Sequence, residues 1–213
     1  AISGDIAAEI FCKKAKLPII VNRNYNIPEY VSEKTLVIAL SYSGGTDEVL
    51  SAVREAEKAG SQVICITSGG KLKELAAAKD YPLYLIPSGY QPRSALPFLL
   101  LPLLVSLGKM GVIPPLQDDI NEAALLLHKL RDEYGPEKPV RVNPVKQLAK
   151  KLVYKIPVIF GSTGSTGAAA LRMKTQFNEN SKMTAICSLF PELNHNEIVN
   201  LSSLKREEHA FAW

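Results

Sequence analysis

Short apolar runs alternate with amphipathic segments along the first half of the chain. Apolar runs rich in Val, Ile and Leu are typical of buried parallel strands, and apolar residues that recur every three or four positions are typical of helices. The predicted strands are 17–21, 36–40, 62–67 and 83–86, and the predicted helices are 3–15, 47–59, 71–79, 94–110 and 115–131. This alternation predicts an α/β fold in which helices cover both faces of a parallel sheet, and we expect the last two helices to pack on that sheet.

The same pattern begins again in the second half of the chain. A strand is predicted at 156–160, followed by a turn rich in glycine and hydroxyl residues at 161–167 and a helix at 168–177. Residues 165–170 align with residues 2–7, with a glycine and several small residues in step. A repeated order of elements predicts two related three-layer α/β/α subdomains with parallel sheets, the second of them incomplete.

The boundary between the two subdomains is predicted in a polar segment, 133–139, which contains a glycine and two prolines. Such residues interrupt helices and strands. We therefore assign residues 1–114 to the first subdomain, 115–143 to a connecting helix and linker, and 144–213 to the second subdomain. We also expect the chain to be truncated at both ends, because it lacks an initiating Met, opens directly into a helix and stops as a strand begins.

Composition and charge limit the kinds of partner that the protein is expected to bind. The 213 residues are 46% hydrophobic and carry a net charge of +4 from dispersed Lys and Arg, so no nucleic-acid partner is predicted. The most apolar stretch, 96–107, contains Pro97 and Pro102 and is shorter than the roughly 20 residues of a membrane span, so it is predicted to be a buried helix and no membrane partner is expected. Three widely separated cysteines favour reduced core thiols and a cytoplasmic location.

The segment Ser41-Tyr42-Ser43-Gly44-Gly45-Thr46 joins a predicted strand to a predicted helix. Amide groups at a helix N-terminus carry partial positive charge, and glycines let the backbone approach a ligand closely. A single helix cap needs one hydroxyl, whereas this turn offers three, from Ser41, Ser43 and Thr46. The turn therefore predicts a phosphate site, with Thr46 also placed to cap the helix.

The next turn on the same sheet edge contains Ser68 and Gly69, which we expect to form the pocket wall together with Gly45. No Lys stands at the spacing of a nucleotide-binding P-loop. The Cys and His residues never fall at metal-ligand spacing, so neither a metal nor another cofactor is predicted. His128 and His209 receive no role.

Three further side chains are candidates for chemistry. A proline precedes Arg93 and fixes the local backbone, Glu179 stands near the end of a predicted helix between two asparagines, and His195 lies in a polar segment predicted to be a loop. From the residues alone, an ordinary solvated surface position is the favoured reading for both Arg93 and Glu179. Because the neighbours of His195 are polar, a structural role in the buried core is the less favoured interpretation of this residue.

The order of the motifs makes a family resemblance specific. The loop at 41–46 is followed by TSGGK at 67–71, QPR at 91–93, KTQFNENSK at 174–182 and PELNHNEIV at 191–199. This order, spread over nearly the whole chain, resembles the bifunctional phosphoglucose/phosphomannose isomerases of the sugar isomerase (SIS) domain superfamily. The first loop is common to the superfamily, and the two later motifs are much narrower.

The resemblance implies an aldose–ketose isomerase that interconverts glucose 6-phosphate, and mannose 6-phosphate, with fructose 6-phosphate through a cis-enediol and without a metal. It implies that Glu179 is the catalytic base, that His195 assists opening of the sugar ring, and that Arg93 stabilises the enediolate. It also implies a homodimer in which His195 is presented across the interface. The chain departs from the family in having Gly45 where Asn is usual, and the family's C-terminal Thr and Lys have no counterpart here.

Two other classes of function stay open at this stage. A sugar-phosphate sensor without catalytic activity shares the first loop and usually carries a DNA-binding segment, which this sequence lacks. The isomerase domain of an amino-sugar phosphate synthase has the same fold and works beside a glutamine-hydrolysing domain, about which the sequence is silent.

Overall fold

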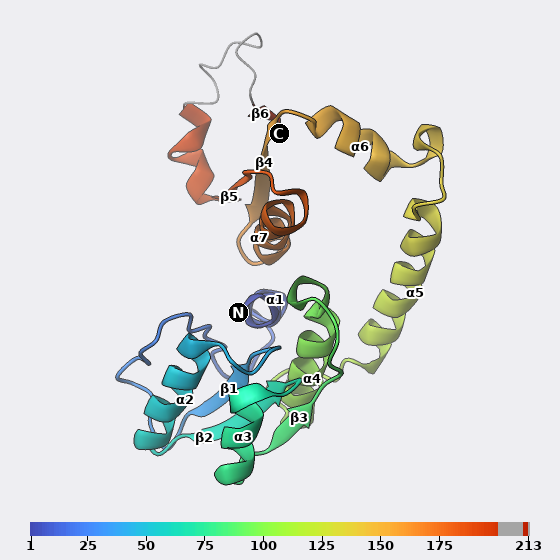
Figure 1. Cartoon of the computed structure of the whole chain (residues 1–213). Coiled ribbons are helices and arrows are strands. Elements are labelled where there is room, and N and C mark those ends of the chain that lie inside the picture. The colour runs from blue at the N-terminus through green and yellow to red at the C-terminus, as the bar shows by residue number, and fades with distance from the viewer. Residues whose placement is uncertain (200–210, 213) are drawn as a thin grey trace. The chain divides into compact units, whose positions relative to one another are not determined.

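The computed structural model describes residues 1–199 and 211–212. The chain forms two compact units, Ala1–Pro114 and Pro115–Trp213, which are described separately below (Figure 1). The three-part assignment made from the sequence, with its separate linker at 115–143, stays a prediction. Among the described residues no helix has the length and apolar character that crossing a membrane requires.

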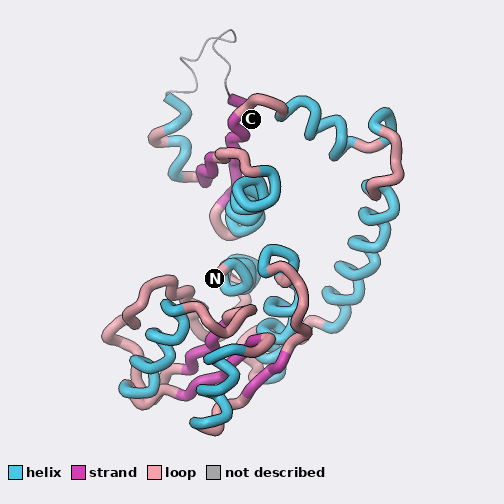
Figure 2. Tube along the Cα trace, viewed as in Figure 1, coloured by secondary structure: helices cyan, strands magenta, loops and turns pink. Residues whose placement is uncertain are grey.

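Unit 1 is built around a three-stranded parallel sheet of order β1-β2-β3 (Figure 2). Its strands match three of the four predicted ones, and its helices lie close to the predicted ranges. The elements are α1 (Ile2–Ile10), β1 (Leu36–Leu40), α2 (Asp47–Lys58), β2 (Gln62–Thr67), α3 (Gly70–Ala78), β3 (Leu83–Leu85), a short 3₁₀ helix (Pro92–Ser94) and α4 (Leu96–Lys109).

The core of unit 1 follows from the alternation of side chains along β2. Val63 and Cys65 are buried in one apolar cluster with residues of α2 and α3, such as Val53 and Leu72. Side chains at alternating positions of a strand point to opposite faces, so the fully buried Ile66 faces the other side, where α4 contacts β2. Helices on both faces of a parallel sheet confirm the predicted α/β class.

The prediction of a strand at 17–21 is wrong, and the first helix ends at Ile10 instead of Ala15. The chain turns after α1, because the N–H groups of Lys14 and Ala15 both donate to the carbonyl of Phe11, and Lys16 N–H then donates to Val112 O, 2.9 Å away. Residues 17–21 join no strand ladder among the described residues. Leu17 and Ile20 are 61% and 64% exposed, so this apolar run is not the buried strand that its composition predicted.

Unit 2 contains a second three-stranded parallel sheet, of order β5-β4-β6. The predicted strand at 156–160 and helix at 168–177 are both present. The elements are α5 (Gln117–Tyr134), a 3₁₀ helix (Val140–Val142), α6 (Pro144–Leu152), β4 (Ile156–Ser162), α7 (Gly167–Gln176), a π-helical turn (Phe177–Ser181), β5 (Ile186–Phe190), a 3₁₀ helix (Glu192–Asn194) and β6 (Phe211–Ala212). His209 lies outside the described residues.

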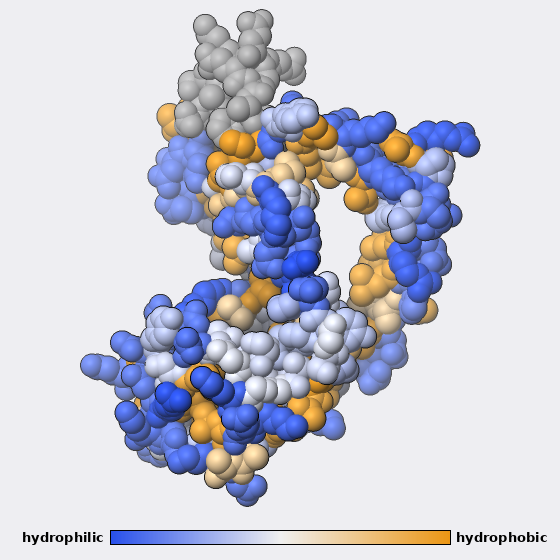
Figure 3. Space-filling model, viewed as in Figure 1, coloured by the Kyte–Doolittle hydropathy of each residue, from blue (hydrophilic) through white to orange (hydrophobic). Residues whose placement is uncertain are grey.

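The two helices expected to pack on the sheet behave differently. α4 contacts β2 and α1 and buries Leu103, Leu104 and Leu107. No residue of α5 is buried, and Leu125 and Leu127 are 72% and 64% exposed. Figure 3 shows apolar atoms at the surface over this helix. The expectation therefore holds for α4, and for α5, which belongs to unit 2, it stays a prediction.

The predicted boundary segment is an ordered connection held by Asn143. This side chain is fully buried, and its Oδ1 accepts from Lys146 N–H at 3.0 Å, which caps α6. Its Nδ2 donates to Tyr134 O at 3.1 Å, at the end of α5. The Lys146 ammonium in turn donates to the carbonyls of Pro136 and Lys138. The glycine and prolines interrupt helical hydrogen bonding in this segment. These side-chain bonds supply donors to the backbone carbonyls there.

Candidate active site

The predicted phosphate loop joins β1 to α2 and is braced by its own hydroxyls. Ser41 is buried, its Oγ lies 2.8 Å from Thr46 Oγ1, and it accepts a hydrogen bond from Gly44 N–H at 3.1 Å. Thr46 stands at the N-cap of α2, but its hydroxyl pairs with Ser41 and does not cap the helix, so that part of the prediction is wrong. The first N–H groups of α2 consequently donate no hydrogen bond to the side chain of their cap residue, which suits binding of an anion.

Gly44 brings this loop into direct backbone contact with the turn after β2. Its φ is +68°, and a Cβ atom there would lie 1.8 Å from the carbonyl oxygen of Gly69, so only glycine fits. Leu72 N–H donates to Gly44 O at 2.8 Å, which ties the start of α3 to the loop. At Gly45, by contrast, the nearest atom to an added Cβ is Ser43 Oγ at 3.9 Å. A side chain at position 45 is therefore sterically acceptable.

The turn after β2 carries the predicted wall residues and one residue that sequence reasoning missed. Ser68 Oγ donates to the Tyr42 carbonyl at 2.6 Å, and Gly69 N–H donates to Thr67 Oγ1 at 3.2 Å. Thr67, which has no exposed surface, also donates to Gly69 O at 3.0 Å. A threonine that ends a strand just before Ser-Gly-Gly is the local signal that could have identified it.

The segment after β3 carries Arg93 and is attached to the phosphate loop by Tyr42. Arg93 is half-buried in the 3₁₀ helix Pro92–Ser94. Tyr42 Oη accepts from Tyr90 N–H at 2.8 Å and donates to Pro87 O at 3.1 Å. The carboxyl ends of parallel strands lie at one sheet edge, where open α/β sheets bind ligands. Unit 1 thus gathers the predicted phosphate, wall and arginine residues on three neighbouring turns.

Glu179 lies at the centre of a π-helical turn that follows α7 directly. The turn ends at Lys182, whose φ is +55° and whose ammonium donates to Glu179 O at 2.7 Å. Asn178 Nδ2 donates to Met183 O at 2.9 Å, which also closes the turn. Glu179 itself is exposed. A π-helical turn is a rare device that recurs at functional sites, and the sequence pattern predicted only a helix end here.

His195 follows the 3₁₀ helix Glu192–Asn194 and is exposed. Its N–H donates to Glu192 O at 2.9 Å. Two residues later, Glu197 Oε1 accepts from Ser188 Oγ at 2.8 Å, which fixes the segment to β5. Glu179 and His195 both belong to unit 2, whereas the phosphate loop and Arg93 belong to unit 1.

The three cysteines have different environments, and none is in a disulfide. Burial raises the pKa of the Cys65 thiol from 9.0 to about 11. Burial also raises the pKa of Cys187, with the nearby Lys174 opposing it. Cys12 is exposed in the turn that ends α1 early, so the prediction of a core thiol is wrong there. In the described part of the chain no three His, Cys, Asp or Glu residues are grouped as metal ligands.

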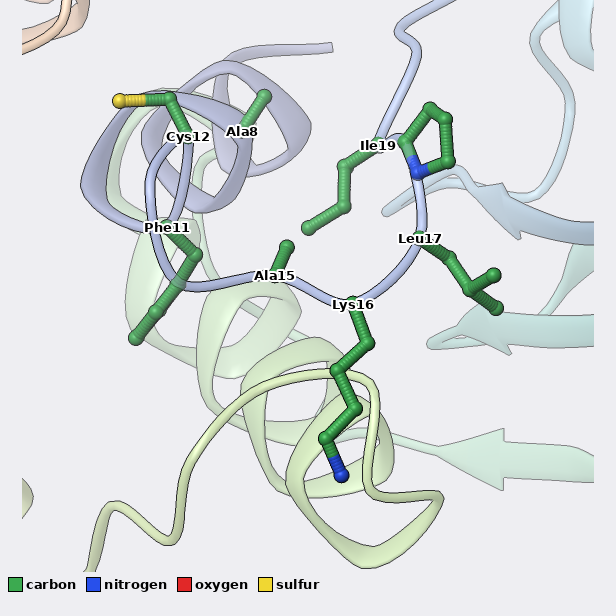
Figure 4. A pocket seen from close by; sticks show the side chains of 8 residues that line it. Ala8, Phe11, Cys12, Ala15, Lys16, Leu17 and Ile19 are labelled. Atoms are coloured by element: carbon green, nitrogen blue, oxygen red, sulfur yellow. The ribbon is translucent and has the colours of Figure 1, made fainter.

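A hollow of about 430 Å³ lies at the end of α1, between that helix and the segment that follows it (Figure 4). Most of its lining residues are apolar, although polar atoms also form a substantial part of the lining surface, and the side chains of Ala15 and Ile19 point toward one another within it. None of the predicted site residues lines it. The hydrogen-bonded turns at the sheet edge, which offer polar groups for a phosphate, are therefore the better candidate site.

Two family models match the chain. Residues 23–99 match the SIS domain, and residues 141–212 match the bacterial phospho-glucose isomerase C-terminal SIS domain. A Bacillus subtilis crystal structure described as a candidate phosphosugar isomerase has the same fold, with a TM-score of 0.67 over 93% of this chain and 62% of that one, at 18% identity. The chain thus belongs to the SIS domain superfamily.

Within that superfamily the chain is similar to the bifunctional phosphoglucose/phosphomannose isomerases. It is 48% identical to the Caldicellulosiruptor bescii enzyme over 96% of this chain and 60% of that protein. It is 40% identical to the Thermoplasma acidophilum enzyme over 99% of this chain and 62% of that protein. The chain therefore spans about 60% of the length of these curated relatives.

Proposed function

We propose that the protein is an aldose–ketose isomerase that converts glucose 6-phosphate and mannose 6-phosphate into fructose 6-phosphate. The observation that carries the proposal is the braced loop at 41–46, a nest of amides and hydroxyls at a helix N-terminus, in a chain 48% identical to a bifunctional isomerase. A phosphate monoester suits such a nest because its oxygens accept hydrogen bonds from both kinds of donor.

In this proposal the substrate phosphate binds at the loop through Ser41, Ser43 and Thr46 and the first amides of α2. Ser41 is buried and already bonded within the loop, so its main contribution is to hold the loop in shape. Ser43 is exposed, and its Oγ receives only a long hydrogen bond, 3.3 Å, from Gly45 N–H. Of the three hydroxyls that the proposal assigns to the phosphate, Ser43 is therefore the one least engaged within the loop, and Ser68, Gly69 and Gly45 are the proposed pocket wall.

The proposed chemistry moves one proton between neighbouring carbons. His195 assists opening of the ring, which exposes the C1 aldehyde. Glu179 takes the proton from C2, the electrons form the enediolate, and the guanidinium of Arg93 stabilises the negative charge on its oxygens. Glu179 then returns the proton to C1. The hydroxyl proton of O2 passes to O1 in the same interconversion, so that C2 carries the ketone oxygen and C1 carries a hydroxyl. Arginine suits the charge-stabilising role because it stays cationic and donates several hydrogen bonds.

Glucose and mannose 6-phosphates differ only in configuration at C2, and both give the same enediol. An active site that allows protonation of either face of C2 therefore accepts both sugars. We further propose that the protein works in the cytoplasm as a homodimer, with His195 contributed to the active site of the partner subunit. Support for the location comes from the three cysteines, none of which is in a disulfide, and support for the homodimer comes from the resemblance to the bifunctional isomerases.

An assay of the full-length protein tests the proposal. We expect fructose 6-phosphate to form from glucose 6-phosphate and from mannose 6-phosphate, at rates that a chelator leaves unchanged. Tight binding of both sugars without turnover would contradict the proposal and favour a sugar-phosphate sensor. Formation of an amino sugar from fructose 6-phosphate and glutamine would favour a synthase.

A further inference from the structure

The hydroxyl of Tyr42 has no part in the proposed reaction, yet it connects two turns of the candidate site. Tyr42 lies in the loop after β1, and its two partners, Pro87 O and Tyr90 N–H, lie after β3. β2 stands between those strands in the sheet. A single phenol oxygen therefore fixes the segment after β3 to the phosphate loop across the whole width of the sheet.

The segment that Tyr42 holds leads directly to Arg93. Residues 86–91 have no regular secondary structure; Ile86 N–H donates to Thr67 O at 3.0 Å at the start of the segment, and the Tyr42 hydroxyl bonds to Pro87 and Tyr90 further along it. The Tyr90 ring packs on Phe98 in α4 with their centroids 4.8 Å apart, which holds the segment from its other side. Ser94 N–H donates to Gln91 O at 2.8 Å and completes the short helix that carries Arg93. Displacement of Tyr90 would thus be transmitted to Arg93.

We propose that Tyr42 is a positioning residue, which sets where the Arg93 guanidinium lies relative to the phosphate loop. The inference rests on the proposed isomerase function. The backbone and side chain of Tyr42 act on different turns, because its carbonyl accepts from Ser68 N–H and Oγ, at 3.0 and 2.6 Å, while only its hydroxyl reaches the segment after β3. Tyr42→Phe therefore removes the link to Arg93 and keeps the link to the turn after β2.

The first test is the kinetics of Tyr42→Phe in the full-length protein. Small misplacements of a catalytic group are costly, so kcat should fall roughly tenfold to hundredfold. KM and the inhibition constant of inorganic phosphate should stay close to the wild-type values, because the phosphate loop keeps its backbone contacts. Tyr84→Phe, which removes the hydroxyl of an exposed tyrosine on β3, is the matched control and should leave kcat unchanged. A rise in KM with unchanged kcat would overturn the proposal.

A double-mutant cycle shows whether Tyr42 acts through Arg93. Coupled residues give non-additive effects, so Tyr42→Phe should change kcat little in a protein that already carries Arg93→Ala. Equal losses of kcat in the wild-type and Arg93→Ala backgrounds would mean that the two side chains act independently, and would overturn the proposal.

Hydrogen exchange separates a failure of this proposal from a failure of the proposed function. The Tyr90 amide should exchange faster in Tyr42→Phe than in wild type, with or without substrate, because it loses its acceptor. Unchanged exchange at Tyr90, or faster exchange with wild-type kcat, would overturn the role of Tyr42. Faster exchange in a protein whose wild type has no isomerase activity would instead overturn the proposed function, and this inference with it.

Discussion

At the scale of single residues, the three hydroxyls of the phosphate loop are not equivalent. Ser41 is 4% exposed and its hydroxyl is hydrogen-bonded to that of Thr46, so its buried side chain stabilises the loop. Ser43 is exposed. The sequence placed all three on one turn, and only the hydrogen bonds distinguish the bracing hydroxyl from the exposed one.

This difference predicts the effect of removing the outer hydroxyls. Ser43→Ala combined with Thr46→Ala should raise KM for the sugar phosphate at least tenfold, which is about 1.4 kcal/mol of binding free energy. The fold should stay intact, because Gly44 N–H still bonds to Ser41 Oγ, while loss of the Ser41–Thr46 hydrogen bond should lower the free energy of unfolding by about 1 kcal/mol. Steady-state kinetics of the full-length protein measure the change. Ser51→Ala, on α2 but outside the loop, is the control, and an unchanged KM in the double variant would move the phosphate site elsewhere.

The thiols give a second prediction at this scale. With its pKa raised from 9.0 to about 11, the native Cys65 stays a protonated thiol at pH 8. Iodoacetamide should therefore modify the exposed Cys12 readily at pH 8 and modify Cys65 only after unfolding. Mass spectrometry of the alkylated protein, native and in urea, measures both sites. Rapid modification of Cys65 in the folded protein would contradict its burial.

The same pKa difference makes stability depend on pH with a defined sign. The folded state holds the Cys65 proton more tightly than the unfolded state, whose thiol has the ordinary pKa of 9.0. The contribution of this thiol is fully present below pH 9 and is lost as the pH rises from 9 through about 11. Cys65→Ser should flatten this part of the pH profile of urea unfolding. A Cys12→Ser control should leave it unchanged.

At the scale of elements, the apolar runs of β1 and β2 predicted those strands residue for residue, because strands buried in a parallel sheet read as continuous apolar runs. The run at 17–21 was wrongly predicted to be a strand, because an apolar composition does not by itself require pairing with another strand. The π-helical turn around Glu179 and the bonds of Tyr42 had no local signal. The partners of the Tyr42 hydroxyl lie 45 and 48 residues further along the chain, beyond the reach of any periodicity.

The connection between α5 and α6 supplies the prediction at this scale. Asn143→Ala removes the cap of α6 and the bond to Tyr134 O, and it should lower the free energy of unfolding of unit 2 by about 1–3 kcal/mol. The Lys146 amide should exchange faster with solvent, because it loses Asn143 Oδ1 as its acceptor. Asn121→Ala, in the exposed first half of α5, removes only a surface hydrogen bond from Gln117 Nε2 and is the control. Unchanged exchange at Lys146 in the Asn143 variant would contradict the capping role.

At the scale of the whole molecule, the residues proposed for catalysis are found in both units of the chain. The phosphate loop and Arg93 are in unit 1, and Glu179 and His195 are in unit 2. The proposed homodimer adds that His195 serves the partner subunit. This arrangement can be tested directly by subunit complementation, because an active site built from two chains can be restored by mixing two inactive variants.

We therefore predict complementation between His195→Ala and Glu179→Gln. Each variant alone should be inactive, and a mixture allowed to exchange subunits should regain partial activity, since a mixed dimer contains one site with both residues intact. The isomerase assay measures the recovery, and native mass spectrometry verifies that mixed dimers form. Proven exchange without recovery would mean that each site is built within one chain.

The measurement that tests the central claim most directly is exchange of the C2 proton of the substrate with solvent in Glu179→Gln. Glutamine keeps the size of glutamate but cannot accept the proton, so kcat should fall by roughly 10² to 10⁴ with a modest change in KM. We predict that incorporation of solvent deuterium at C2, followed by NMR, stops in step with turnover. If the variant still exchanges that proton at the wild-type rate, Glu179 is not the base and the proposed mechanism is wrong.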